Sequence, residues 1–123
     1  MARLFLLLAA FSGFTSVALG AFAAHGLRQQ LSAEYLAVFQ TGVQYQQLHV
    51  LALLAVALLL QRQAGRLLIV SGGFFVAGML LFSGSLYALT LTGIGKLGII
   101  TPFGGVAFML GWLLLGLSVW RQR

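Results

Sequence analysis

The sequence predicts an all-α integral membrane protein: a four-helix bundle with an additional amphipathic helical stretch between the first and second spans. The first reason is composition, because 61% of the 123 residues are hydrophobic, the mean hydropathy is +1.05 and only 7% are charged. A soluble domain carries about 25% charged residues, so this chain has too few to cover a water-exposed surface. The second reason is that the charges leave four apolar runs near the roughly 20 residues that a membrane-crossing helix needs. We expect one membrane domain, residues 1–123, with spans at about 4–24, 43–60, 67–90 and 102–120.

The first expected span lies between two arginines. From Arg3 to Arg28 the sequence contains no aspartate, glutamate, lysine or further arginine. A secretory signal peptide is the alternative, because Ala21-Phe22-Ala23 resembles a cleavage site. The apolar run is, however, longer than the 7–15 residues or so of a signal-peptide core. We therefore expect this run to cross the membrane as a retained helix.

An amphipathic helical segment is expected at residues 33–43. Ser32 is a suitable N-cap, and Glu34 in the first turn interacts favourably with the helix dipole. On a helical wheel the polar and apolar side chains of this stretch fall on different sides. Such a segment either lies at the membrane surface or packs under the bundle. The second span follows it and ends at Gln61-Arg62.

The connection between the second and third spans differs from the connection between the third and fourth. Residues 61–66 form a short loop, which predicts that the second and third spans are adjacent and antiparallel. The connection at 91–102 is longer and rich in glycine. Thr101 and Pro102 at its end are typical of an N-cap and a first helical position, so the fourth span begins there.

The charges predict the orientation. Four spans place both termini and the 61–66 loop on one side, which then holds five of the seven cations: Arg3, Arg62, Arg66, Arg121 and Arg123. Only Arg28 and Lys96 remain for the other side. Because cytoplasmic loops are enriched in lysine and arginine, both termini are expected in the cytoplasm.

This topology gathers most unusual polar side chains toward the non-cytoplasmic end. An intramembrane polar group is costly unless it is paired, so such groups are candidates for a functional site. The candidate ligand-binding set is His25, Arg28, Glu34, Thr41, Tyr45, His49, Ser83, Ser85, Tyr87, Lys96 and Thr101. Arg28 and Lys96 are its natural donors to an anion. The same side chains are also suited to cross-linking helices and to satisfying the loop backbone, and both interpretations stay open.

Several kinds of chemistry are disfavoured. A paired-carboxylate mechanism is excluded within one chain because Glu34 is the only side-chain carboxylate, and the absence of cysteine excludes a thiolate nucleophile. A histidine could activate Ser83 or Ser85, but no nucleophile-elbow pattern accompanies them. His25, His49 and Glu34 match no compact metal motif, although haem ligation by the two histidines is not excluded. We expect no catalytic residues, no metal and no cofactor.

The expected function is that of a non-enzymatic helix-bundle scaffold, or of a protein that binds lipid or a partner near the non-cytoplasmic face. The alternative is a transporter or channel for ions or small molecules, which would act as an oligomer because 13.1 kDa rarely encloses a path alone. The expected partners are membrane lipids and a second copy of the chain. Despite a net charge of +6, no nucleic-acid partner is expected, because the cations are scattered at segment ends.

Four motifs resemble the DUF423 family of small membrane proteins, which includes the eukaryotic transmembrane protein 256. They are GAFAAHGL (20–27), FQTGVQYQQLH (39–49), FSGSLY (82–87) and GIITPFGG (98–105). The resemblance covers almost the whole chain, with Ala23 in place of the glycine that many members carry. It implies a four-helix protein of the cell inner (plasma) membrane with no established molecular activity. Its motif positions are His25, Gly26, Thr41, Tyr45, His49, Ser83, Ser85, Tyr87, Thr101 and Pro102.

Overall fold

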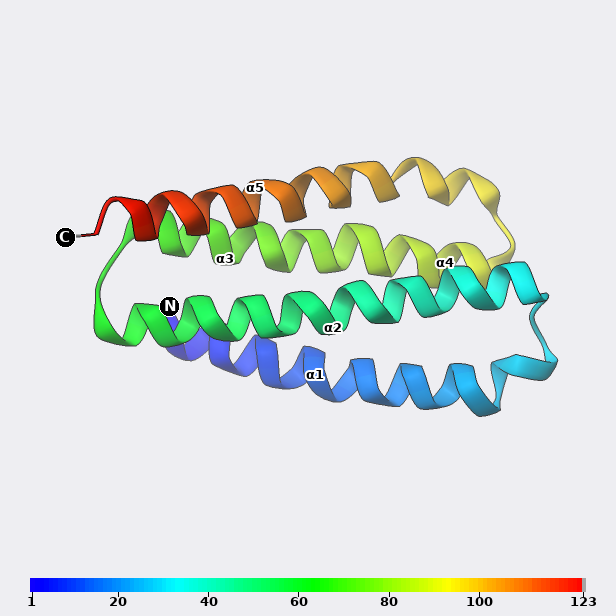
Figure 1. The fold of residues 1–123 in the computed structure, drawn as a ribbon. Helices are drawn as coiled ribbons and strands as arrows, with labels where there is room; N and C mark the ends of the chain where they lie inside the picture. The colour runs from blue at the N-terminus through cyan, green and yellow to red at the C-terminus, as the bar shows by residue number, and fades with distance from the viewer. Residues whose placement is uncertain (123) are drawn as a thin grey trace.

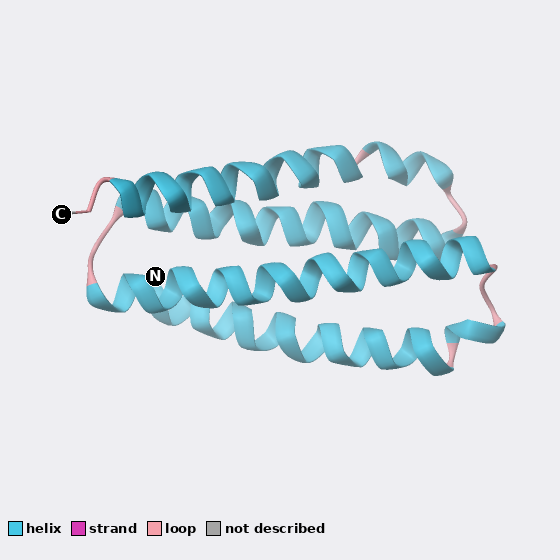
Figure 2. Cartoon of the chain, in the orientation of Figure 1, coloured by secondary structure: helices cyan, strands magenta, loops and turns pink. Residues whose placement is uncertain are grey.

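The computed structural model describes residues 1–122, and these are helical apart from short connections (Figure 2). The main helices are α1 (Ala2–His25), α2 (Ala33–Arg62), α3 (Arg66–Gly78), α4 (Gly84–Thr92) and α5 (Thr101–Trp120). A five-residue π-helical segment, η2 (Met79–Ser83), joins α3 to α4, and two short 3-10 segments are η1 (Leu27–Gln29) and η3 (Gly95–Ile99). The described residues contain no strand, so the predicted all-α class is confirmed.

The described residues form four long helical rods, which run antiparallel along a common axis (Figure 1). Each is long and apolar enough to cross a membrane, with α3, η2 and α4 counting as one rod and η3 with α5 as another. The N-terminus, the α2–α3 connection and the C-terminal residues lie at one end, called here the terminal end. The connections at 26–32 and 93–100 lie at the opposite end, the loop end. The four-helix membrane bundle predicted from the sequence is therefore confirmed.

The amphipathic stretch expected at 33–43 forms the first turns of α2 and is continuous with the second span. The Ser32 hydroxyl accepts a hydrogen bond from the Tyr35 amide at 3.1 Å, which confirms the predicted N-cap. The inner face of the stretch packs inside the bundle, where Phe39 and Gly42 are buried. At about 1.5 Å per residue, a 30-residue helix exceeds the roughly 30 Å hydrocarbon core, so α2 extends beyond it.

Glycines let the helices approach closely around large aromatic rings. A Cβ atom at Gly104 would overlap the backbone nitrogen of Phe82, so the backbones of α5 and η2 are in close contact there. In four further pairs between helices an aromatic ring occupies the space that a Cβ would need: Gly42 with Tyr87, Gly72 with Phe5, Gly78 with Phe108, and Gly111 with Phe75. These contacts fill the interior between the helices.

The apolar core has two parts. The larger cluster lies toward the terminal end and includes the fully buried Leu53, Val56 and Phe75. A smaller cluster near the loop end is built from Ala23, Leu27, Phe39 and Val43. Many large apolar side chains instead point outward, as is appropriate for a surface that faces lipid tails. Buried polar side chains lie near both clusters, and they form the candidate site.

Candidate functional site

His49 lies near the middle of α2 with both ring nitrogens engaged inside the bundle. Its Nδ1 is 2.7 Å from the carbonyl oxygen of Tyr45, and its Nε2 is 3.0 Å from the indole nitrogen of Trp112. A carbonyl only accepts and an indole N–H only donates, so Nδ1 carries the proton and Nε2 provides the lone pair. The contacts therefore require the neutral ring in a single tautomer.

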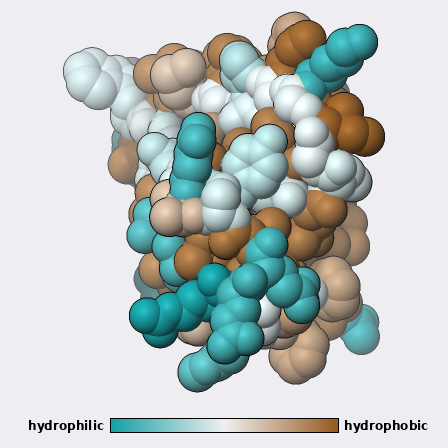
Figure 3. Space-filling view, turned by 90° about the vertical axis from the view of Figure 1, so that its right-hand side faces the viewer, coloured by the Kyte–Doolittle hydropathy of each residue, from teal (hydrophilic) through white to brown (hydrophobic). Residues whose placement is uncertain are grey.

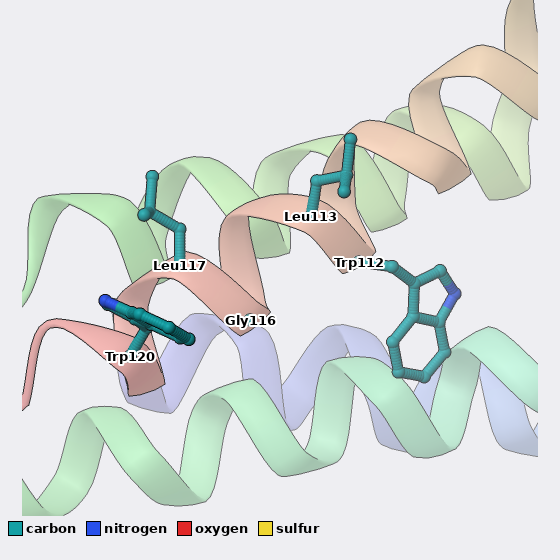
Figure 4. A pocket seen from close by; sticks show the side chains of 5 residues that line it. All are labelled: Trp112, Leu113, Gly116, Leu117 and Trp120. Carbon is teal, nitrogen blue, oxygen red and sulfur yellow. The ribbon is translucent and has the colours of Figure 1, made fainter.

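Aromatic rings enclose this histidine and connect three helices. The ring of Phe108 stacks on it with 3.5 Å between centroids and a 7° interplanar angle. Phe75 packs against it at 5.7 Å and also contacts the edge of Trp112 at 5.2 Å. Figure 4 shows the Trp112 side chain extending from α5 toward α2. The lone pair that a metal or haem would need is already used, so His49 acts here as a link between α2 and α5.

A second set of polar groups joins α1, α2 and α4. We call it the Gln46 network, and it consists of the side chains of Thr15, Gln46 and Tyr87 and the backbone carbonyl of Ser12. The Gln46 amide nitrogen donates to the Ser12 carbonyl oxygen at 2.9 Å and to the Thr15 hydroxyl at 2.9 Å. Its carbonyl oxygen accepts from the Tyr87 hydroxyl at 2.6 Å. Thr15 in turn donates to the Ser12 carbonyl at 3.1 Å. Because that carbonyl can only accept, the orientation of the Gln46 amide is fixed.

Buried hydroxyl groups make the remaining links between helices. Ser83 of η2 donates to the Gly42 carbonyl of α2 at 2.7 Å, and Ser71 of α3 donates to the Gly111 carbonyl of α5 at 2.7 Å. The hydroxyls of Ser85 and Thr101 are 2.5 Å apart and join α4 to α5. Within residues 1–122, no buried side-chain nitrogen or oxygen lacks a hydrogen-bond partner. The interior polar groups thus hold the bundle together.

The structure divides the eleven predicted site residues among three places. Buried or half-buried links between helices are made by His49, Ser83, Ser85, Tyr87 and Thr101. Exposed positions at the loop end are held by His25, Arg28, Glu34 and Lys96. Thr41 and Tyr45 lie on α2 between them, where Thr41 bonds the Ala37 carbonyl of its own helix and Tyr45 is 42% exposed. The predicted set is therefore not one cluster.

The loop end does not carry a continuous polar surface. Figure 3, which views the molecule from this end, shows hydrophilic side chains interspersed with apolar ones. Among the described residues, no group of three or more histidine, cysteine, aspartate or glutamate side chains is placed to hold a metal. The charged side chains at this end, Arg28, Glu34 and Lys96, are all exposed.

Sequence reasoning missed the residues that pair with the candidates: Ser12, Thr15, Gln46, Ser71 and Trp112. Gln46 had a readable signal, because it lies three residues after the buried Val43 and three before His49, on the same face of α2. Trp112 had none, because a tryptophan in an apolar span is equally suited to face lipid.

The Gln46 network borders a recess of about 220 Å³ in the side of the bundle, called here the lateral recess. It lies between α1 and the η2–α4 segment, with α2 behind it, near the middle of the helices. Phe11 and Leu80, exposed by 66% and 70%, lie at the recess on its two sides, so it is open toward lipid. The lining residues that matter below are Phe11, Ser12, Thr15, Gln46, Gly84 and Tyr87.

Other hollows differ in chemistry. A larger groove of about 580 Å³ runs along α5 between Trp112 and Trp120, with Leu113, Gly116 and Leu117 in its lining (Figure 4). The two indole groups are its only polar side-chain groups. A hollow of about 310 Å³ at the terminal end is lined by arginine and glutamine side chains near the α2–α3 connection. Of these three hollows, the lateral recess is the one that borders the Gln46 network.

The fold and these contacts define a small multi-span α-helical membrane protein whose interior polar groups tie its helices together. The chain belongs to the DUF423 family, described as a protein of unknown function, whose family model matches residues 19–105. The resemblance inferred from the four motifs is thereby confirmed.

Relatives align with nearly the full chain. The UPF0382 membrane protein YwdK of Bacillus subtilis is 45% identical over 92% of this chain and 93% of its own length. The UPF0382 inner membrane protein YgdD of Escherichia coli (strain K12) is 44% identical over 98% of this chain and 92% of its own. A UPF0382 membrane protein of Haemophilus influenzae is 44% identical over 100% and 98%, respectively. No solved structure matches the chain.

Proposed function

We propose that this membrane protein is a non-enzymatic lipid-binding scaffold that holds a lipid-soluble molecule in the lateral recess. The observation that carries the proposal is a hydrogen-bonding network beside an opening in the lipid-facing wall. Polar groups next to hydrocarbon are costly, and a pocket with few polar groups in an apolar lining is the usual form of a small-molecule site. The rest of the bundle then serves to position this wall.

The hydrogen-bond partners of the potentially reactive side chains support a non-enzymatic function. His49 bonds Tyr45 and Trp112, whereas Ser83 donates to a backbone carbonyl and Ser85 pairs with Thr101. A serine nucleophile needs a general base, most often a histidine, within hydrogen-bond reach to remove its proton. The hydrogen bonds of His49 lead to other groups, which favours a structural role for these residues.

The proposal places the terminal end in the cytoplasm. Arg3, Arg62, Arg66 and Arg121 belong to this end, whereas Arg28 and Lys96 belong to the loop end, and Arg123 lies outside the described residues. The positive-inside rule then favours cytoplasmic termini. The name of the Escherichia coli relative supports an inner-membrane location. In this orientation the recess lies near mid-depth, deeper than the non-cytoplasmic rim where the sequence predicted a site.

No specific observation on the described residues favours the alternative function, transport by an oligomer. The glycine–aromatic contacts fill the space between the helices of one chain. A pathway would therefore have to form between copies, and a homo-oligomer stays a prediction from the sequence. Membrane lipids remain the partners that the proposal requires.

The proposal is tested by filling the recess. A Cβ atom at Gly84 meets no other atom within 4 Å, so Gly84→Leu adds a side chain that begins in open space at the recess. Gly73 is equally open but lies at a different, apolar hollow, so Gly73→Leu is the matched control. We expect native mass spectrometry to detect a retained lipid on the parent protein and on Gly73→Leu, and its loss from Gly84→Leu. Equal retention by all three folded proteins would contradict the proposal.

A further inference from the structure

The hydrogen bonds of the Gln46 network restrict the kind of molecule that the lateral recess can hold. The two amide protons of Gln46 go to the Ser12 carbonyl and the Thr15 hydroxyl. The Tyr87 proton goes to Gln46 and the Thr15 proton goes to the Ser12 carbonyl. Every donor on these three side chains is therefore already used.

Acceptor capacity remains at the same place. A hydroxyl oxygen and an amide oxygen each have two acceptor positions. Within residues 1–122, the Gln46 oxygen uses one of these positions, the Thr15 oxygen uses one, and no donated bond to the Tyr87 oxygen is found. Ser83 neighbours the Tyr87 hydroxyl, but its single proton goes to the Gly42 carbonyl. The network thus offers lone pairs to a ligand and withholds protons.

One further hydroxyl at the recess is different. Ser12 is among the residues that line the recess, and within residues 1–122 no hydrogen bond of its hydroxyl group is found. It is therefore able to donate one proton as well as to accept. The recess as a whole combines several acceptors with a single donor.

We propose that the lateral recess binds a neutral long-chain alcohol, whose hydroxyl donates to the Gln46 network and accepts from Ser12. This inference rests on the proposed lipid-binding function and adds the chemical class of the ligand. A hydroxyl group both donates and accepts, so it matches this combination. An ether or ketone only accepts and leaves the free acceptors unused, because Ser12 is the single donor available to it.

Charge and size agree with a neutral ligand. All cationic side chains in the described residues lie near the helix ends, away from the mid-depth recess, so a carboxylate or phosphate there would be buried without a counter-charge. A volume of about 220 Å³ admits the hydroxyl and the first carbons of the chain. The remaining chain then lies along the exposed Phe11 and Leu80 at the edge, within the lipid tails.

The test compares three diazirine-bearing probes that share one chain: a C16 alcohol, its methyl ether and the corresponding carboxylic acid. The parent protein is placed in phosphatidylcholine nanodiscs, illuminated, digested and mapped by mass spectrometry. We expect the alcohol to label residues 11–19 and 79–87 at least about fivefold more than either other probe, as loss of one hydrogen bond predicts. An isoprenoid C15 alcohol run in parallel distinguishes an isoprenoid source from a saturated one.

Two variants separate the possible failures. Thr15→Val releases one amide proton of Gln46, so the preference for alcohol over ether should fall by at least half, whereas Gly84→Leu should abolish labelling at these residues and Gly73→Leu should not. If alcohol and ether label the parent equally while Gly84→Leu blocks both, the alcohol assignment is wrong and the lipid site stands. If Gly84→Leu changes nothing, both proposals are wrong. Cross-linking of two chains through these residues, in place of probe labelling, would identify a protein occupant and overturn the assignment.

Discussion

The indole N–H of Trp112 on α5 donates to Nε2 of His49 on α2 across 3.0 Å, although the two residues are 63 positions apart. This bond, together with the stack on Phe108, places the only buried histidine of the described residues among aromatic rings. A hydrogen bond between helices in a membrane is worth about 0.6 kcal/mol on average and at most roughly 1.7.

Removing the indole N–H group should show how much this hydrogen bond contributes to the free energy of unfolding. Trp112→Phe keeps an aromatic ring but leaves Nε2 of His49 without its donor, so we expect a loss of about 1 kcal/mol in the free energy of unfolding. In a His49→Leu background the same change should cost less, because the partner is gone. Denaturation by SDS in mixed micelles measures both values. Trp120→Phe, at a position that is 85% exposed, is the control and should be nearly neutral.

The backbone contact of Gly104 predicts a sharp difference between two neighbouring glycines. An added methyl group at Gly104 would overlap the Phe82 backbone, whereas the nearest atom to a Cβ at Gly105 is 3.9 Å away. Gly104→Ala should therefore destabilise the bundle by about 1–3 kcal/mol through overpacking. Gly105→Ala should be neutral or slightly stabilising. Thermal unfolding of the two variants in the same detergent compares their stabilities. Equal midpoints would contradict the prediction, because they would mean that the η2 backbone shifts to accommodate the added methyl group without a loss of stability.

The contribution of the Gln46 network to stability can be measured by comparing the same substitution at Gln46 and at its neighbour Gln47. Gln46 is buried and bonded to three groups, whereas Gln47 is exposed. Gln46→Met keeps the length of the side chain but leaves the Tyr87 hydroxyl and the Thr15 oxygen without their partner, so we expect a loss of about 1–3 kcal/mol. Gln47→Met should stay within about 0.5 kcal/mol of the parent. The measurement is unfolding in SDS, monitored by tryptophan fluorescence.

The orientation is testable with single introduced cysteines, because the chain contains no native cysteine that would react with the reagent. Glu34→Cys lies at the loop end and Gln61→Cys lies near the terminal end, and both positions are exposed. Cytoplasmic termini predict that a membrane-impermeant maleimide labels position 34 in spheroplasts and position 61 only after lysis. The opposite pattern would invert the topology that we propose.

Much of the fold follows from signals that are local in the chain. The apolar runs and the charged residues between them locate the four rods, and Ser32 caps α2 as its sequence context predicts. The length of α2 was harder to predict, because polar glutamines interrupt a helix whose continuation depends on burial of Phe39 and Gly42. Hydrophobicity alone does not distinguish a surface segment from the start of a long buried helix.

The candidate site depended on helix register, which composition does not determine. His49 and Tyr87 were recognised as unusual, but their partners Trp112 and Gln46 come from other helices or looked ordinary in sequence. Placing His25 and His49 at one end followed from topology, yet α2 carries His49 four turns past its N-terminus, to the middle of the bundle. The lateral recess needed the packed side chains, because its lining comes from α1, α2, η2 and α4.

The links of α2 also bear on how the chain assembles during synthesis. His49 and the Gly42 carbonyl take their side-chain partners from α5 and η2, which are made after α2. A nascent hairpin of α1 and α2 alone would therefore enter the bilayer with Nε2 of His49 lacking its donor and the Gly42 carbonyl lacking its second, side-chain bond. The Gln46 amide nitrogen, in contrast, would already have its bonds to α1. The second hairpin thus supplies the hydrogen-bond partners that the first one lacks. Chains that end after Arg62 should therefore insert less stably and be degraded more readily by membrane proteases.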